Sequence, residues 1–171
     1  MASFESLVFL RGMSARYQPD RPFIKEVRSD RRPRDSSFAF HAAADDWFYR
    51  RFGVRYRTHA VFVTSRTLTA TAYAASPAHV MRVVPLTHYR YCWSPKVSDL
   101  LFKANEFAAA DTAAINNFLD SADYQERGLE EAHAAGHEVM VHCDRFVAIP
   151  MGLFPLVEVP AASGIVLPLG F

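Results

Sequence analysis

Three polar residues of different kinds, Arg28, Thr64 and Glu138, each stand at the edge of an expected β-strand. An arginine fork binds phosphate oxygens in pairs, and a hydroxyl at a strand end can orient a polar ligand in a groove. A carboxylate stabilises positive charge that develops nearby in a transition state. Together the three side chains would suit a reaction in which a sugar that carries a pyrophosphate loses a cationic base.

The hydroxyl pair Thr64-Ser65 directly follows the apolar run 60–63 (AVFV). Apolar residues then recur at helical spacing over 68–75. This pattern predicts a strand that delivers hydroxyls to the rim of a groove, with a helix packed behind it. A strand followed by a simple threonine N-cap is the structural alternative.

Arginines crowd the end of the expected strand 23–28 (FIKEVR) and the residues after it. Four fall within seven positions, namely Arg28, Arg31, Arg32 and Arg34. Because guanidinium groups bind phosphates and carboxylates bidentately, the cluster predicts an anion site. A solvated, salt-bridged loop is the alternative, since Asp30 and Asp35 lie among these arginines.

Three stretches, taken in this order, resemble the Arg–Ser/Thr–Glu branch of the ADP-ribosyltransferase superfamily, of bacterial-toxin or phage type. Residues 27–36 (VRSDRRPRDS) are similar to its arginine-bearing first strand and the Asp-x-Arg-x-Pro run that often follows. Residues 61–74 (VFVTSRTLTATAYA) resemble its strand ending in Ser-Thr-Ser, with a helix of spaced alanines behind. Residues 136–141 (GHEVMV) are similar to its late strand that opens on glutamate. The resemblance covers residues 23–150.

The resemblance implies a toxin-like effector that binds NAD as its substrate in a cleft between two short, roughly perpendicular sheets. It implies cleavage of the nicotinamide–ribose bond and transfer of ADP-ribose to an acceptor, with no metal. Glu138, Arg28 and Thr64 are the implied catalytic residues. The implied NAD-binding residues are Arg28, Arg31, Thr64, Ser65, Phe62, Tyr73 and Arg11.

Two departures from the family pattern affect these assignments. Arginine-modifying members carry Glu-x-Glu, whereas Gly136 stands two residues before Glu138, so arginine is not the expected acceptor. Protein, nucleic acid, a small molecule and water remain open as acceptors, and water would make the protein an NAD glycohydrolase. Arg11, followed by Gly12 as in some members, is the rival of Arg28 for the first-strand arginine.

The length of 171 residues and a hydrophobic content of 50% predict one domain over 1–171 with a core of its own. The mixed order of the expected elements, with strands at both ends and helices in two groups, predicts an α+β fold. The expected helices lie outside the cleft: one covers 36–52, and two lie within 98–120, the first capped by Ser98 and the second starting near Asp111. The expected strands are 6–10, 23–28, 60–63, 80–86, 138–142 and 145–149. Residues 146–171 hold one charge and four prolines, which favours short strands and turns over a membrane span.

Other function classes have weaker support in the sequence. The arginines of 28–34 and 50–57 predict a basic face for nucleic acid, with Tyr89, Tyr91 and Trp93 stacking bases, although a net charge of +1 does not require it. The set His133, His137, His142 and Cys143 is a possible zinc site with irregular spacing. Two cysteines make no disulfide framework, which favours the cytoplasm, either of the producing cell or of a target cell.

Overall fold

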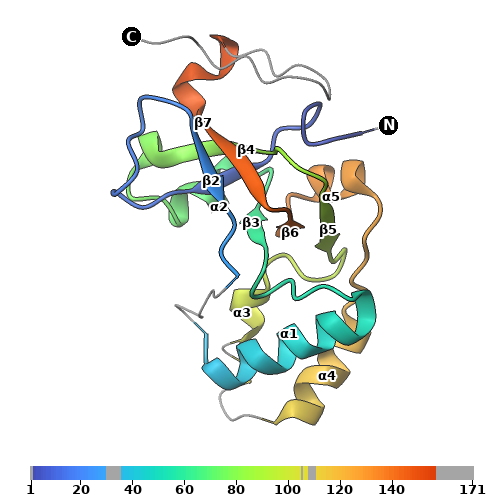
Figure 1. Ribbon diagram of the computed structural model, residues 1–171. Helices are drawn as coiled ribbons and strands as arrows, with labels where there is room; N and C mark the ends of the chain where they lie inside the picture. The colour runs from blue at the N-terminus through green and yellow to red at the C-terminus, as the bar shows by residue number, and fades with distance from the viewer. Residues whose placement is uncertain (1, 30–35, 105, 108–110, 157–171) are drawn as a thin grey trace.

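The computed structural model describes residues 2–29, 36–104, 106–107 and 111–156. Over these ranges the chain is α+β, with two small antiparallel sheets and five α-helices (Figure 1). This confirms the fold class predicted from the sequence.

The larger sheet has four strands in the order β1 (Leu10–Gly12), β4 (Val80–Pro85), β7 (Arg145–Pro150) and β2 (Phe23–Glu26). The central strands β4 and β7 are almost wholly buried, as expected of continuous apolar runs. The edge strand β2 alternates half-buried and exposed side chains, as its sequence pattern predicts.

The smaller sheet has three strands in the order β3 (Val61–Val63), β6 (Val139–His142) and β5 (Arg90–Trp93). The two sheets meet where β1 runs beside the end of β3. There the amide of Leu10 donates to the carbonyl of Thr64 at 2.7 Å, and the amide of Thr64 donates back at 2.9 Å. This bridge places Thr64 opposite Leu10, the residue directly before Arg11.

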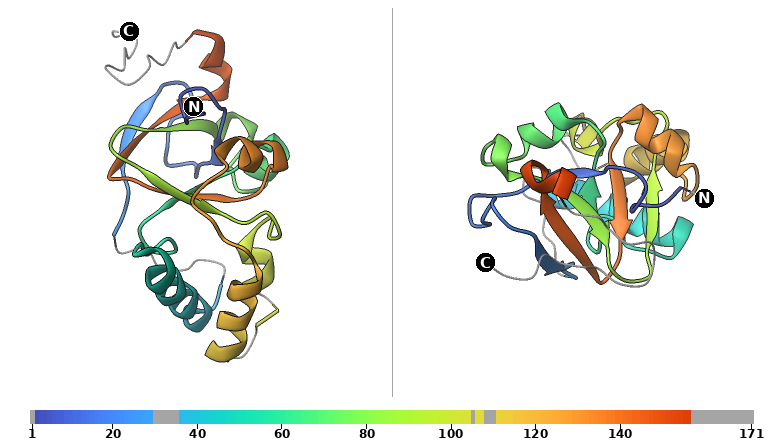
Figure 2. Two further views of the ribbon diagram at one scale, coloured as in Figure 1. Left: turned by 90° about the vertical axis from the view of Figure 1, so that its right-hand side faces the viewer. Right: turned by 90° about the horizontal axis from the view of Figure 1, so that it is seen from above.

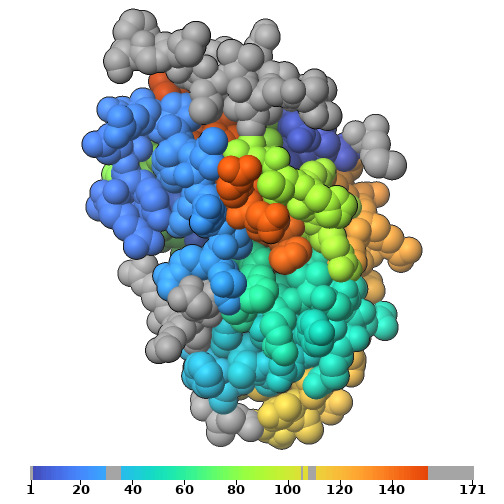
Figure 3. Space-filling view, in the orientation of Figure 1, coloured from blue at the N-terminus to red at the C-terminus, as the bar shows by residue number. Residues whose placement is uncertain are grey.

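Helix α1 (Phe38–Phe52) has strong local signals at both ends and confirms the predicted helix 36–52. The Ser37 hydroxyl accepts from the amide of Phe40 at 3.1 Å, and Gly53 ends the helix in the left-handed conformation at φ 72°. The helix packs against α4 (Thr112–Ser121) at the end of the molecule away from β7 (Figures 1 and 2). Figure 3 shows that α1 forms much of that surface on one face.

The other helices are short. The two helices predicted within 98–120 are α3 (Leu100–Ala104) and α4, and Asp111 caps the second. Helix α2 (Thr67–Ala72) follows β3, and α5 (Leu129–Ala135) precedes β6. Two 3₁₀ turns, η1 (Pro77–His79) and η2 (Met151–Leu156), complete the described elements. The predictions for 157–171 fall outside the described residues.

The prediction of a strand over 6–10 was wrong in its position. Residues 3–7 form a turn, in which the amides of Ser6 and Leu7 both donate to the carbonyl of Ser3. The strand begins only at Leu10, where it pairs with β4 and ends at Gly12. Phe4 and Phe9 are fully buried although neither belongs to a strand, and the carbonyl of Phe9 accepts from the amide of Val83 in β4 at 2.9 Å.

No described helix has both the length and the apolar character needed to cross a membrane.

Candidate functional site

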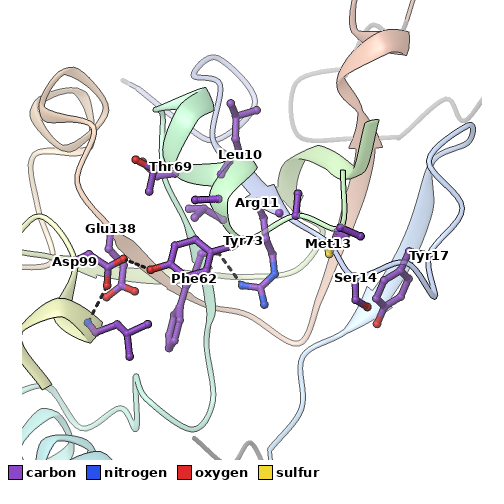
Figure 4. Close-up of a pocket in the computed structure, with 18 of the residues that line it drawn as sticks. Leu10, Arg11, Met13, Ser14, Tyr17, Phe62, Thr69, Tyr73, Asp99 and Glu138 are labelled. Carbon is purple, nitrogen blue, oxygen red and sulfur yellow. Dashed lines mark hydrogen bonds between the residues drawn. The ribbon is translucent and has the colours of Figure 1, made fainter. Parts of the chain in front are cut away.

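A cavity of about 680 Å³ lies where β1 and β3 meet, a volume in the usual range of small-molecule sites. Helix α2 and the starts of α3 and β6 form other parts of its wall. Figure 4 shows side chains from these elements pointing into it. The polar and aromatic groups that matter most for chemistry are Arg11, Phe62, Thr64, Tyr73, Asp99 and Glu138.

Arg11 reaches into this cavity from the middle of β1 (Figure 4). Its Nη1 donates to the carbonyl of Phe62 at 2.9 Å, which fixes one side of the guanidinium against β3. Burial lowers the pKa of Arg11, while the negative potential of Tyr17 and Glu138 acts in the opposite direction. A guanidinium in this position can bind an anionic part of a ligand.

Gly12 explains how α2 can lie so close to β1. A Cβ atom at Gly12 would stand 2.3 Å from the carbonyl oxygen of Ala70 and 2.6 Å from the carbonyl carbon of Tyr73. Both are backbone atoms, which cannot move aside as the tip of a side chain can. The pair Arg11-Gly12 therefore supplies a cation and the space for the helix that forms the opposite wall.

Thr64, Ser65 and Arg66 bind the end of α5 and the turn that leads from it into β6. The Thr64 hydroxyl donates to the carbonyl of Gly136 at 2.9 Å. The Ser65 hydroxyl donates to the carbonyl of His133 at 2.5 Å, and Arg66 Nη2 to that of Ala135 at 2.9 Å. The hydroxyls therefore hold the backbone that carries Glu138, which is a more specific role than the rim predicted from the sequence.

Glu138 stands directly before β6, with its side chain 14% exposed. Its amide donates to the carbonyl of Ser98 at 2.7 Å, so the backbone at this point is anchored. Its Oε1 lies 3.4 Å from Nη1 of Arg57. The carboxylate is thus held at the wall of the cavity and faces the same space as Arg11 (Figure 4).

Phe62 from β3 and Tyr73 from the end of α2 are among the aromatic residues that border the same space. The Tyr73 hydroxyl donates to Oδ2 of Asp99 at 2.7 Å, and Asp99 Oδ1 accepts from the amide of Leu101 at 2.8 Å. Asp99 is buried, and it caps the start of α3 where the sequence had indicated Ser98. The cavity therefore combines aromatic surface with two carboxylates.

The structure does not bring every predicted residue to the cavity. Arg28 is exposed, lies two residues beyond the end of β2, and is not among the described residues of the cavity wall. Arg31 lies outside the described residues. The residues that the fold brings together are Arg11, Thr64 and Glu138, so the arginine at the cavity is the rival candidate of the sequence analysis.

Sequence reasoning missed four charged residues of the cavity wall, namely Arg16, Lys25, Arg57 and Asp99. Asp99 carried no motif, and its buried carboxylate is evident only from the fold. Arg57 had been assigned to a basic surface, but it is 5% exposed and contacts Glu138. An arginine shortly before a buried strand was the one local signal for it, and that signal is not specific.

The side chains considered for zinc and for base stacking have other contacts. His137 and His142 each bond a backbone carbonyl through Nδ1, at 2.8 Å, and no three potential metal ligands gather anywhere in the described ranges. Trp93 is buried and donates to the carbonyl of Arg127, while Tyr89 and Tyr91 pack edge-on against Phe4.

Comparisons with models of protein families, with curated proteins and with solved structures gave no match.

Proposed function

We propose that this chain is an NAD-dependent mono-ADP-ribosyltransferase, which cleaves the nicotinamide–ribose bond and passes ADP-ribose to an acceptor. One observation carries the proposal: Arg11, Thr64 and Glu138, from three separate strands or strand ends, converge on a single cavity. Their order in the chain and their types agree with the resemblance found in the sequence. The arginine in this proposal is Arg11 and not Arg28.

Two kinds of group bind NAD in this proposal: a cation holds the pyrophosphate, and aromatic rings hold the nicotinamide. The guanidinium of Arg11 pairs with the pyrophosphate, which brings a negative group to a partly buried cation. The nicotinamide ring carries a positive charge in NAD, so it is attracted to the faces of aromatic rings. Phe62 and Tyr73 offer such rings, and the nearby carboxylate of Asp99 favours a cation at this end.

The chemical step breaks the bond between the ribose carbon and the nicotinamide nitrogen. The bonding electron pair leaves with the nicotinamide, which becomes neutral, and the positive charge passes to the ribose as an oxocarbenium ion. The carboxylate of Glu138 stabilises this ion more than it stabilises the ground state, because the charge reaches the sugar only during the reaction. The acceptor then bonds to the ribose carbon and gives up its proton, with Glu138 as the base.

Water as the acceptor would give an NAD glycohydrolase by the same steps. Both activities release nicotinamide, but only the transferase leaves ADP-ribose bound to a second molecule. The acceptor therefore decides between the two, and the same residues serve both.

A nucleic-acid or anion-binding module remains the second candidate, and the arginine-rich segment is its support. Two observations weaken it. Arg55 of the proposed basic face pairs with Asp45 and Asp46, and Trp93, which was to stack on a base, is buried in the core. A steep fall of nucleic-acid affinity with rising salt would favour it.

The deciding experiment is incubation of the protein with NAD, followed by measurement of free nicotinamide. The reaction is run with and without candidate acceptors, and labelled ADP-ribose is traced to protein, nucleic acid or solution. We expect nicotinamide release and an NAD-dependent rise in melting temperature. Absence of both with every acceptor tried would refute the proposal.

A further inference from the structure

Arg57 is a buried cation in the cavity wall that none of the steps above uses. Arg57 stands in the segment of the chain that connects α1 to β3, and it is 5% exposed. Its guanidinium carbon sits 4.6 Å from the centroid of the Phe62 ring, and Nη1 lies 3.4 Å from Oε1 of Glu138. Taking an arginine out of water is unfavourable unless a partner compensates the charge. Among the described residues, Glu138 is the carboxylate with which Arg57 forms an ion pair.

The backbone of Arg57 is fixed as firmly as its side chain. Asp45, a buried residue of α1, accepts from the amide of Arg57 at 2.9 Å and from the amide of Thr58 at 3.1 Å. Its other oxygen accepts from the Thr58 hydroxyl at 2.7 Å. These bonds anchor the backbone from which the guanidinium extends toward Phe62 and Glu138.

The ion pair is not explained by stability alone. The Nε atom of Arg57 is buried and has no hydrogen-bond partner in the described part of the chain. A buried donor without a partner destabilises the folded state, and buried ion pairs often stabilise a protein no more than apolar residues would. A cost of this kind next to a reactive cavity points to a functional role.

We propose that Arg57 is a positioning residue for Glu138, and this inference rests on the proposed function. The guanidinium holds the carboxylate in one orientation at the cavity wall, ready for the charge that develops on the ribose. Preorganised electrostatic groups act best when they need no reorientation during the reaction. Arg57 thus acts through Glu138 and makes no bond to NAD, in contrast to Arg11.

The test compares nicotinamide release by wild type, Arg57→Met, Glu138→Gln and the double variant. Arg57→Met keeps much of the side-chain volume and removes the charge. We expect kcat to fall about 10- to 100-fold, as for a displacement of about 1 Å at a reacting group. KM for NAD and the NAD-induced melting shift should stay within about twofold, because phosphate binding belongs to Arg11. Arg51→Met, at an exposed arginine of α1, is the matched control and should behave as wild type.

The double variant decides whether Arg57 acts through Glu138. If it does, adding Arg57→Met to Glu138→Gln slows the reaction no further, since groups that act as a unit are not additive. Arg57→Lys keeps a cation and should give an intermediate kcat, and it serves as the test variant if Arg57→Met does not fold. If the double variant slows the reaction by the product of the two single effects, or if Arg57→Met leaves kcat unchanged, the role of Arg57 is refuted while the proposed function stands. A wild type that releases no nicotinamide would instead overturn the proposed function, and this inference with it.

Discussion

The hydroxyl of Thr64 donates a 2.9 Å hydrogen bond to the backbone carbonyl of Gly136, two residues before Glu138. Thr64 and Gly136 are 72 positions apart in the chain, and the donor Thr64 is buried. The bond therefore ties the end of β3 to the turn that delivers the carboxylate. Gly136 takes a left-handed φ of 68° in that turn, which glycine adopts without strain.

This bond predicts the behaviour of Thr64→Val, which keeps the shape and removes the donor. The buried Gly136 carbonyl then loses a partner, so the free energy of unfolding should fall by about 1–3 kcal/mol. The rate of nicotinamide release should fall as well, because Glu138 is less firmly held. Denaturant unfolding and steady-state kinetics check the two effects. Thr71→Val is the control, since the exposed Thr71 hydroxyl bonds within α2 and water can replace it. Equal stability losses in the two variants would contradict this role for Thr64.

The carboxylate of Glu138 is expected to act on the chemical step and not on NAD binding. Glu138→Gln keeps the size of the side chain and removes its charge, so nicotinamide release should slow by about 10²–10³-fold. The NAD-induced rise in melting temperature should remain. Glu131→Gln, on α5, is the control and should keep the wild-type rate. A Glu138→Gln rate above about a tenth of wild type would exclude the proposed charge stabilisation.

The two candidate arginines can be separated by their effects on NAD binding. Arg11 lines the cavity and Arg28 does not, so Arg11→Ala should abolish the NAD-induced shift in melting temperature and Arg28→Ala should retain it. Calorimetric titration with NAD gives the same comparison without heating. The reverse pattern would return the first-strand role to Arg28, as the sequence analysis first favoured.

Gly12 is expected to tolerate no side chain. In Gly12→Ala the new methyl group would overlap the backbone of α2, with the Ala70 oxygen 2.3 Å away. The free energy of unfolding should fall by about 1–3 kcal/mol, the usual cost of overpacking, or more if α2 cannot shift. Because Tyr73 would move with α2, NAD affinity should fall too. Gly152→Ala is the control, since a methyl group there meets no atom within 4 Å.

The two thiols should be unreactive in the folded protein. Burial raises the pKa of Cys143 to about 12, with a smaller contribution from Asp144, and burial raises the pKa of Cys92 well above its usual value. Both stay protonated at pH 8, and the thiolate is the nucleophile. Titration with an aromatic disulfide should label neither thiol before unfolding and both after it. Since the folded pKa of Cys143 is raised, its contribution to stability is present below the unfolded pKa of about 8.5 and is lost as pH rises toward 12. Rapid labelling of either thiol in the native chain would contradict the expected lack of reactivity.

Several elements follow from local sequence signals, and these were predicted well. Ser37 and Gly53 bracket α1, and their capping depends only on residues within four positions. The strands β2, β3, β4 and β7 each match a short run with a clear apolar pattern. Such signals were enough to predict an α+β chain.

The candidate site depended on contacts that no local pattern encodes. Arg11 bonds the carbonyl of Phe62, 51 positions away, and Arg57 meets Glu138 across 81 positions. Which arginine enters the cavity depends on where β1 begins, and that is set by its pairing with β4 and by the turn that buries Phe4. By itself, the sequence determined the kinds of side chain available and the local elements that carry them. Only the tertiary structure decided which of them share one cavity, because strand pairing and burial bring together residues whose distance along the chain says nothing of their distance in space.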